Sequence, residues 1–386
     1  MVKEAVKIRP SMTREEALKR ARALGEVVAA YAQEAERIRR IPLPVVEEVM
    51  QSGLMPLVRP RYWGGYGLDW MAFVDCIGEI GRASGSIGWC AGFLMHHQWV
   101  LGHFPKEGQA LVYNTHNDPK IVTAFAVQGS AERTSGGYRV TGDWSFGSGG
   151  DHCDWAIVGA AVAGEMPRFM LLKPGQFTMR DTWHSVGLKG TGSNNIVVKH
   201  ALVSEECTLE TGAFYSGRSP GASFIDEPLY QTSALAQFQF GLLAPMMAIA
   251  RGAHASFIEF NRNRTTGLMG GKAADDPFIQ ARAGESSAEI EAAYGILERI
   301  NRGIVAGKHR TPTDAAEVTR DFAMTARLLL QSVNRLFEVS GARGLAESNA
   351  IGRHWRDAHA ITHHVALNVD GMFQSYGRQL FGSAKS

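Results

Sequence analysis

The chain has 386 residues, of which 45% are hydrophobic and 20% charged; this composition is typical of a large globular protein, and the length favours two or three domains sharing one body. Its net charge of +2 gives no strong attraction to nucleic acid or to an anionic membrane, so neither partner is expected. The chain shows no apolar signal segment, no run of about 18 uncharged apolar residues and no C-x-x-C pair among its cysteines, which predicts a cytoplasmic protein with reduced thiols.

The first third of the chain, residues 1–118, is predicted to form a helical domain. Ser11 or Thr13 can cap a first helix, because glutamate and then apolar residues at helical spacing follow. Residues 44–50 predict a short helix with proline in its first turn. Residues 59–67 read as a loop, and the nearly uncharged residues 86–104 predict a buried helix.

Residues 119–226 are predicted to form a β-domain. Short runs of β-branched and aromatic residues lie between glycines, prolines, asparagines and aspartates over residues 120–203. This pattern is typical of an antiparallel sheet.

Residues 227–386 are predicted to form a C-terminal four-helix bundle, because long helical patterns resume there with short connections. The first helix covers residues 237–264, and the second begins at Pro277 after Asp276. The third begins at residues 313–314 and runs to Val339, with Gly341 as its stop. The fourth is expected to run from residue 353 to about residue 380. The fold class is therefore a multi-domain α+β protein.

Four stretches carry a family resemblance: P-x-x-x-G-G-x-G at residues 60–67, G-Y-R-V-T-G-D-W-S-F-G-S-G-G-D-H-C-D-W at 137–155, W-H-S-V-G-L-K-G-T-G-S-N-N at 183–195, and the C-terminal residues 355–377. Over nearly its whole length the chain resembles the acyl-CoA dehydrogenase superfamily. Within it, the chain is most similar to flavin-dependent monooxygenases. These are oxygenase components of two-component systems, such as p-hydroxyphenylacetate and hydroxylated-steroid hydroxylases. The resemblance implies an acyl-CoA dehydrogenase-like fold.

The distribution of carboxylates separates two chemistries within this superfamily. Most acyl-CoA dehydrogenases take their base from a glutamate in the C-terminal segment, and a smaller subset takes it from the first bundle helix. This chain has no glutamate after Glu347 and no acidic residue in residues 228–258. The resemblance therefore argues against acyl-CoA dehydrogenation and favours the monooxygenases.

The resemblance implies a flavin site on the loop that follows the strand ending near Trp144. Ser148 would lie near the flavin N5, with Trp144, Ser145 and Phe146 on the same edge. Taken alone, such a Gly/Ser loop is an ordinary β-turn. The glycine-rich residues 187–193, with Gly190, Thr191 and Ser193, look like a phosphate cradle outside any βαβ unit.

No nicotinamide-binding unit is evident, so the flavin would arrive already reduced, as diffusible FMN or FAD, from a separate reductase that forms a transient complex or none. Arg251 and Arg264 are candidates for the ribityl or phosphate end of the flavin, although each can equally be a solvated helix arginine. The family assembles homotetramers, and Gly341 would approach a flavin held partly by a neighbouring subunit.

Three C-terminal histidines, His359, His363 and His364, replace the missing carboxylate. His359 and His363 share a helix face by their spacing, whereas His364 points away from it. A hydrolytic zinc motif would need a glutamate between the first two, so no metal is expected. His364 matches the family's catalytic histidine and would protect a flavin C4a-hydroperoxide, with its neighbour His363 as the alternative.

A second catalytic histidine is implied across the pocket. His97 would contact the substrate hydroxyl and assist its deprotonation, with His96 as the alternative. The pocket would draw on apolar and aromatic residues, namely Trp63, Trp70, Phe93, Met95 and Phe373. The expected reaction is hydroxylation by O2 of a small aromatic, phenolic molecule. The alternatives are N- or S-oxygenation, another flavin oxidation of a non-phenolic substrate, or a non-catalytic flavin-binding paralogue.

Overall fold

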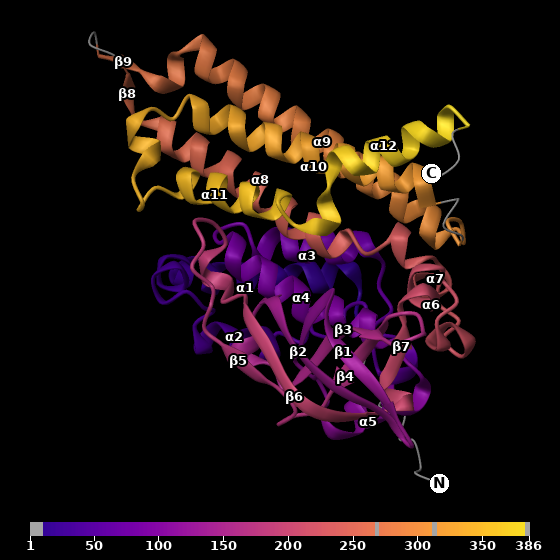
Figure 1. The fold of residues 1–386 in the computed structure, drawn as a ribbon. Helices are drawn as coiled ribbons and strands as arrows, with labels where there is room; N and C mark the ends of the chain where they lie inside the picture. The colour runs from indigo at the N-terminus through magenta and orange to yellow at the C-terminus, as the bar shows by residue number, and fades with distance from the viewer. Residues whose placement is uncertain (1–10, 267–269, 311–314, 383–386) are drawn as a thin grey trace.

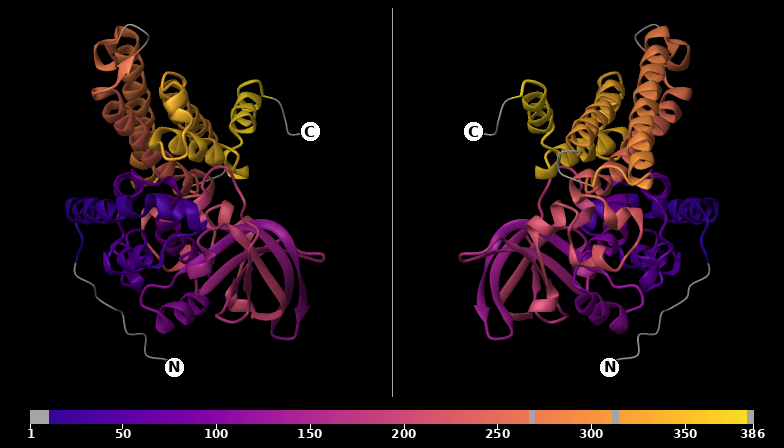
Figure 2. Two further views of the ribbon diagram at one scale, coloured as in Figure 1. Left: turned by 90° about the vertical axis from the view of Figure 1, so that its left-hand side faces the viewer. Right: turned by 90° about the vertical axis from the view of Figure 1, so that its right-hand side faces the viewer.

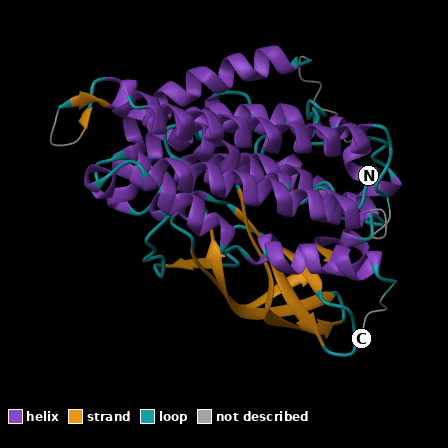
Figure 3. Cartoon of the chain, turned by 90° about the horizontal axis from the view of Figure 1, so that it is seen from above, coloured by secondary structure: helices purple, strands orange, loops and turns teal. Residues whose placement is uncertain are grey.

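The computed structural model describes residues 11–266, 270–310 and 315–382. A helical bundle lies above the rest of the molecule, and the N-terminal helices and the sheet lie side by side beneath it (Figure 1, Figure 2). Seen from above, the sheet emerges along one side of the helical layers (Figure 3). The N-terminal helices are α1 Arg14–Ile38, α2 Leu43–Gln51, α3 Trp70–Ile80, α4 Gly85–Leu101 and α5 Lys106–Thr115.

Side-chain caps begin three of these helices. The side chains of Thr13, Asp69 and Ser84 accept hydrogen bonds from backbone N–H groups in the first turns of α1, α3 and α4. The predicted helix start at Thr13 and the predicted buried helix after Ser84 are thus confirmed. In α4 every residue is buried except Phe93, because the helix runs between strand β1 and helices α3, α8 and α11.

The central sheet has seven strands in the order β5-β6-β2-β1-β3-β4-β7. They are β1 Ile121–Thr134, β2 Gly137–Gly147, β3 Trp155–Val162, β4 Arg168–Leu172, β5 Thr178–Arg180, β6 Asn194–Ser204 and β7 Thr208–Glu210. The pairs of this sheet are antiparallel as predicted except one, since β1 and β3 are parallel. After the β1–β2 hairpin, residues 148–154 carry the chain past β1 to its other edge, and this crossing loop lies against α4.

The C-terminal bundle is built from α8 Phe240–Arg262, α9 Pro277–Val305, α10 Ala315–Glu338 and α11 Ala350–Thr362, with α12 Val369–Leu380 packed on α10. Two short helices, α6 Thr211–Tyr215 and α7 Pro228–Gln231, precede it, and the hairpin β8 Thr265–Thr266 and β9 Gly271–Lys272 follows α8. Asp276 caps α9 with Pro277 in its first turn, as predicted. The predicted start of the third helix lies outside the described residues. None of the helices in the described ranges is long and apolar enough to cross a membrane.

The predicted fourth helix is broken in two, so that prediction was wrong. Helix α11 ends at Thr362, and residues 365–367 form a 3-10 turn before α12. The His364 side chain accepts a hydrogen bond from the Ala366 N–H, and Asn368 accepts one from the Gly371 N–H. These side-chain bonds satisfy backbone donors that a continuous helix would use, and they turn the chain at the histidines.

The Trp144 side chain packs inside the sheet. Its side chain is fully buried, and its indole N–H donates to the Gly159 carbonyl at 2.6 Å. The ring lies over the facing pair Gly129 and Gly142 of β1 and β2. A Cβ on Gly129 would lie 2.0 Å from the ring, so glycine is required there. The expected contact of the Trp144 side chain with a flavin is therefore not supported.

We predict that Gly129→Ala destabilises the protein by about 1–3 kcal/mol, because the buried and hydrogen-bonded Trp144 has no space into which to move. The matched control is Gly136→Ala in the turn of the same hairpin, where an added Cβ meets nothing within 4 Å. Thermal unfolding followed by tryptophan fluorescence would measure both. Equal melting temperatures for the two variants would contradict the role of this contact.

Candidate active site

One face of helix α4 carries three rings at helical spacing. Trp89, Phe93 and His97 are four residues apart, and their ring centroids are 4.5 Å apart for the first pair and 5.1 Å for the second. This face looks toward the crossing loop after β2, strand β1 and the end of α11. Phe93 was predicted for the substrate pocket, and its partial exposure in an otherwise buried helix fits that position.

His97 is held in one tautomer by its two partners. Its Nδ1 lies 2.7 Å from the Ile121 carbonyl oxygen, which can only accept, so Nδ1 carries the proton. Its Nε2 therefore presents a lone pair, which the Thr123 hydroxyl meets at 2.9 Å. Burial lowers the pKa of His97 to about 4, so the ring is neutral and Nε2 is a proton acceptor.

His96, the alternative to His97, points to another side of α4. Its ring lies among aromatic side chains, 5.5 Å from Trp70 and 5.1 Å from Trp99 between centroids. Neither ring nitrogen has a hydrogen-bond partner among the described residues, and burial lowers its pKa well below the usual value. Of the two, His97 is the one hydrogen-bonded to the sheet.

His364 approaches the same α4 face from the C-terminal region. Its ring centroid lies 6.0 Å from that of Trp89. Its Nδ1 accepts the Ala366 N–H, so the proton of the neutral ring is on Nε2. Burial lowers the pKa of His364 to about 4, which keeps the ring neutral. His97 and His364 thus present opposite functions through Nε2, an acceptor on one and a donor on the other.

The other two C-terminal histidines have structural partners. His359 Nε2 bonds to the Asn334 side-chain oxygen at 2.9 Å, and its ring packs against Trp355. His363 is exposed, and its Nδ1 donates to the His359 carbonyl. The structure therefore places His364, and not His363, against the α4 face.

A chain of hydroxyl groups begins at Trp89. The Trp89 indole N–H donates to Ser148 Oγ at 3.0 Å, and Ser148 Oγ lies 2.7 Å from Ser193 Oγ. Ser193 Oγ lies 2.6 Å from Thr191 Oγ1, which donates to the Leu188 carbonyl at 2.8 Å. The chain links the loop after β2 to residues 188–193, and it includes three of the residues predicted for the flavin site.

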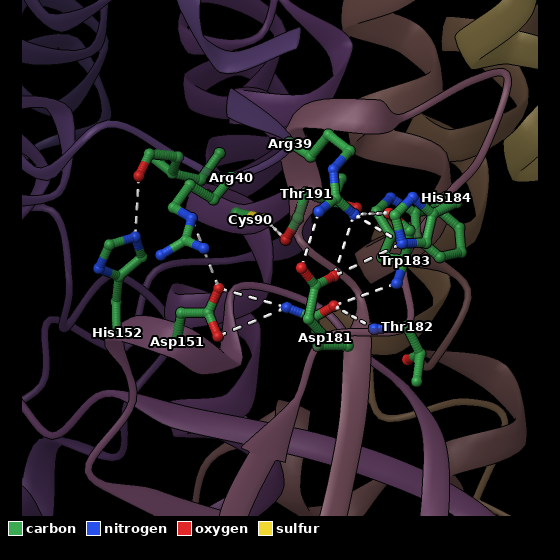
Figure 4. Close-up of polar contacts among 12 residues, drawn as sticks. Arg39, Arg40, Cys90, Asp151, His152, Asp181, Thr182, Trp183, His184 and Thr191 are labelled. Atoms are coloured by element: carbon green, nitrogen blue, oxygen red, sulfur yellow. Dashed lines mark hydrogen bonds and ion pairs between the residues drawn. The ribbon is translucent and has the colours of Figure 1, made fainter. Parts of the chain in front are cut away.

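The loop before β6 is fixed to its surroundings by polar contacts (Figure 4). Arg39 pairs with Asp181 at 2.7 Å and donates to the Trp183 carbonyl at 2.6 Å. The Thr191 carbonyl accepts the Gly149 N–H at 2.8 Å and the Cys90 thiol at 3.5 Å. These contacts from α1, α4 and the crossing loop hold the hydroxyl chain in place.

Leu188 has the left-handed backbone conformation, with φ 51°, which is uncommon for a residue with a side chain. Its N–H donates to Asp357 Oδ1 at 2.7 Å. The other Asp357 oxygen has no partner among the described residues. Burial, reinforced by the charge of Glu36, raises the pKa of Asp357 to about 7. Asp357 on α11 thus holds the strained end of the loop.

In the predicted phosphate cradle, the N–H groups of Gly190 and Thr191 and the hydroxyls of Thr191 and Ser193 already have partners within the protein. The Gly190 N–H donates to Ser86 Oγ and the Thr191 N–H to the Leu188 carbonyl. A Cβ on Gly190 would lie 2.9 Å from the Ala35 Cβ, which explains the glycine by close packing. The hydroxyls of Thr191 and Ser193 are therefore linked to Ser148 within the protein.

Several predicted residues lie elsewhere. Trp63 stacks on Tyr113 and donates to Gln109, and Phe373 lies under the guanidinium of Arg327 on the α12 side of the bundle. Among the described residues, no hydrogen bond or ring contact joins either side chain to Trp89, Phe93 or His97. The predicted use of Trp63 and Phe373 as substrate contacts is therefore not supported within one chain.

The two predicted arginines are also apart from the hydroxyl chain. Arg251 lies over the Tyr294 ring between α8 and α9. Arg264 donates to the Val339 carbonyl at 3.5 Å and lies beside Gly341, at the end of the bundle near β8 and β9. Arg264 and Gly341 thus form a second group of predicted flavin contacts, separate from the hydroxyl chain.

At the end of β2, Phe146 has φ 72° and a ring that is 64% exposed, while the Ser145 N–H donates to the Gln128 side-chain oxygen. The Phe146 ring lies against Trp183, with ring centroids 6.1 Å apart. Ser148, Phe93 and His364 each contact Trp89, so these three predicted residues lie together. In the described part of the chain no carboxylate is hydrogen-bonded to Ser148, His97 or His364.

Sequence reasoning missed Trp89, Thr123 and Asp357. Trp89 could have been found, because it precedes Phe93 and His97 at the same helical spacing. Thr123 and Asp357 could not, because their roles depend on contacts between segments far apart in the chain.

The chain matches known proteins over nearly its whole length. Residues 12–110 match the acyl-CoA dehydrogenase N-terminal domain, and residues 240–369 match the acyl-CoA dehydrogenase C-terminal domain. The flavin-dependent monooxygenase oxygenase subunit HsaA of Rhodococcus jostii is 32% identical, and the match covers 95% of this chain and 98% of that protein. The oxygenase component of an FADH2-dependent resorcinol hydroxylase from a Rhizobium species is 31% identical over 93% of this chain and 92% of its own. The crystal structure of 3-HSA hydroxylase from a Rhodococcus species superposes with a TM-score of 0.90, at 31% identity, over 96% of this chain and 98% of that chain.

We predict that Asp357→Ala destabilises the protein by about 1–3 kcal/mol, because the buried Leu188 N–H loses its acceptor. Asp357→Asn is the matched control, since its amide oxygen can still accept that N–H. The melting temperature of each variant at several pH values measures the effect.

The pH dependence of the melting temperature tests the raised pKa of Asp357. Because the pKa of Asp357 is raised from 3.8 to about 7, its neutral form stabilises the native state at low pH, and this stabilisation is lost as pH rises toward 7. Asp357→Asn has no group that titrates at this position. Its melting temperature relative to that of the wild type should therefore rise as the pH is raised from 4 to 7. A difference that is constant with pH would contradict this assignment.

Proposed function

Because the chain belongs to the flavin-dependent monooxygenase branch of the acyl-CoA dehydrogenase family, we propose that it is the oxygenase component of a two-component system that hydroxylates a small phenolic molecule. Reduced FAD or FMN from a separate reductase would supply two electrons to O2. One oxygen atom enters an aromatic C–H bond and the other leaves as water. The comparisons favour this reading, since the named relatives are oxygenase components or hydroxylases.

The observation that carries the proposal is a pair of neutral imidazoles at the α4 face. Nε2 is a hydrogen-bond acceptor on His97 and a donor on His364. His97 Nε2 accepts from the Thr123 hydroxyl, so a phenol bound to that hydroxyl could pass its proton through Thr123 to His97, and its ring carbons then become electron-rich. His364 Nε2 carries a proton that can be donated to a bound oxygen species. Trp89 and Phe93 lie between them and exclude water from this face.

A separate reductase is proposed because the strands of the described ranges form no βαβ unit. The one parallel pair, β1 and β3, is joined through the antiparallel strand β2 and not through a crossover helix. A nicotinamide cofactor therefore has no doubly wound sheet on which to bind. Electrons would come as reduced flavin.

The second group, Arg264 and Gly341, supports a homotetramer in which each flavin is shared between subunits. Arg264 directly precedes β8, which lies at one end of the bundle (Figure 1), and among the described residues neither Arg264 nor Gly341 is hydrogen-bonded to Ser148. A neighbouring copy could present this group to the flavin tail.

The four cysteines are unpaired, which supports a reducing, cytoplasmic location.

We predict that His364→Ala raises hydrogen peroxide release and lowers hydroxylated product by about tenfold, because the loss of one hydrogen-bond donor is worth roughly that factor. The assay mixes enzyme, anaerobically reduced flavin and a phenol with O2 and measures both products. The lifetime of any near-ultraviolet absorbance that precedes oxidised flavin should shorten in parallel.

The matched control for this experiment is His363→Ala, which removes the exposed neighbouring imidazole. An unchanged ratio of hydroxylated product to hydrogen peroxide in His364→Ala would exclude His364 from this role. An equal fall of that ratio in the control would exclude it as well. A wild type that gives peroxide and no hydroxylated product from any phenol would exclude the proposed function itself.

We predict that His97→Asn lowers kcat/KM for a phenol by about 10²–10⁴, the usual contribution of a positioned base. In the wild type, kcat/KM should show no ionisation of His97 between pH 5 and 8. The reason is its lowered pKa: the neutral form persists above about pH 4, and the acceptor lone pair is lost only as pH falls through that value.

The phenol's O-methyl ether serves as the substrate control, because it has no proton for His97 to accept. Turnover of the ether at the phenol's rate would favour an oxygenation that needs no phenol. An ionisation near pH 6.5 in the wild type that disappears in His97→Asn would contradict the buried, neutral assignment.

A further inference from the structure

The hydroxyl chain that ends at Ser148 has only one direction. At one end the Trp89 indole nitrogen can only donate, and at the other the Leu188 carbonyl can only accept. Between them stand three hydroxyls, each with one hydrogen. The four contacts therefore use one indole hydrogen and three hydroxyl hydrogens, with none left over.

All four contacts can be hydrogen bonds in a single arrangement. Thr191 donates to Leu188, so its oxygen must accept from Ser193. Ser193 has then used its hydrogen, so its oxygen must accept from Ser148. Ser148 in turn accepts from Trp89. Reversing any link would set two lone pairs against each other at 2.6–2.8 Å and leave a buried hydroxyl without its partner.

Both ends of the chain are held firmly. The Leu188 carbonyl also accepts the Trp183 indole N–H at 2.9 Å and the Thr191 N–H at 3.1 Å, while the Leu188 N–H is held by Asp357. At the other end, Trp89 is buried in α4 and packed against Phe93. The direction of the chain is therefore a fixed property of the fold.

The direction determines what Ser148 offers to a ligand. Its hydrogen points to Ser193 and one of its lone pairs receives Trp89, which leaves one lone pair and no hydrogen. Ser148 is 9% exposed, whereas Thr191 is fully buried and Ser193 is 5% exposed. A ring nitrogen that meets Ser148 must therefore be a hydrogen-bond donor.

We propose that this one-way chain makes the site select reduced over oxidised flavin, with Ser193 and Thr191 as positioning residues that act through Ser148. The inference rests on the proposed function and on Ser148 meeting the flavin N5. In the reduced flavin N5 carries a hydrogen and can donate. In the oxidised flavin N5 has only a lone pair, so binding would require Ser148 to turn its hydrogen away from Ser193.

Selection of reduced flavin suits an enzyme that takes up diffusible flavin from a separate reductase for each turnover. The reduced form enters in competition with oxidised flavin, and the oxidised product has to leave after each turnover. A contact that favours N5–H and loses its partner when N5 is oxidised assists both steps without any movement of the protein.

The test uses Ser193→Ala and Thr191→Val in the full-length protein, titrated with reduced flavin under anaerobic conditions and with oxidised flavin. In each variant the Ser148 hydrogen is released from the chain and can turn to an oxidised N5. The wild type should bind reduced flavin at least about tenfold more tightly, and each variant should lower that ratio by about tenfold. The midpoint potential of the bound flavin should become more negative by about 30 mV for each tenfold change in ratio.

Two controls accompany the variants. Thr191→Ser keeps a hydroxyl in the chain and should retain the wild-type ratio. Ser185→Ala removes a hydroxyl of the same loop that bonds to the Gly187 carbonyl outside the chain, and it should also retain the ratio. A general loosening of the loop would change all four proteins together and the two affinities in parallel.

The outcomes separate this inference from the proposed function. Equal affinity of the wild type for both redox forms, or an unchanged ratio in Ser193→Ala and Thr191→Val, overturns the inference even if phenol hydroxylation is observed. A protein that binds neither form of flavin overturns both.

Discussion

The site depends on one short segment, residues 188–193, because that segment is bonded to all three parts of the molecule. The Leu188 N–H is held by Asp357 of the bundle, the Gly190 N–H by Ser86 of α4, and the Thr191 carbonyl by the Gly149 N–H of the crossing loop. Each bond uses a different backbone group. The segment can therefore not move without breaking a contact to the bundle, to the N-terminal helices or to the sheet.

The fixed position of this segment also determines which hydrogen-bonding groups the hydroxyl chain can offer to a ligand. Because Leu188 is fixed, its carbonyl is a fixed acceptor, and the three hydroxyls that follow take their direction from it. The two imidazoles are set in the same way by backbone groups: the Ile121 carbonyl places the proton of His97 on Nδ1, and the Ala366 N–H places that of His364 on Nε2. Burial keeps both rings neutral, so donor and acceptor functions are set by the fold and not by the pH of the medium.

Much of the fold could be predicted from the sequence, since its signals are local. Thr13 and Asp276 show helix starts, and the uncharged residues around Phe93 show a buried helix. The parallel pair β1–β3 could not be predicted, because strand direction follows from which edge the crossing loop reaches. The break at His364 was missed because apolar periodicity continues across it, while the side-chain bond to Ala366 that turns the chain leaves no periodic signal.

For the candidate site, motif similarity found residues but not their orientations. Ser148, His97 and His364 lie on or against the α4 face, yet Trp144 from the same motif as Ser148 turns into the sheet, where Gly129 leaves space for its ring. Side-chain direction in a strand alternates, so a motif that ends a strand contains residues of both faces.

Energetically unfavourable features gather around the same segment. Leu188 and Phe146 have positive φ values, and one Asp357 oxygen lacks a partner among the described residues. Such features persist only where surrounding contacts over-determine the conformation. Here the donors around the Leu188 carbonyl and the buried helix α4 provide those contacts. Relaxing the segment would remove the strain and, with it, the fixed direction of the hydroxyl chain, so the strain is tied to the feature that gives Ser148 its single free lone pair.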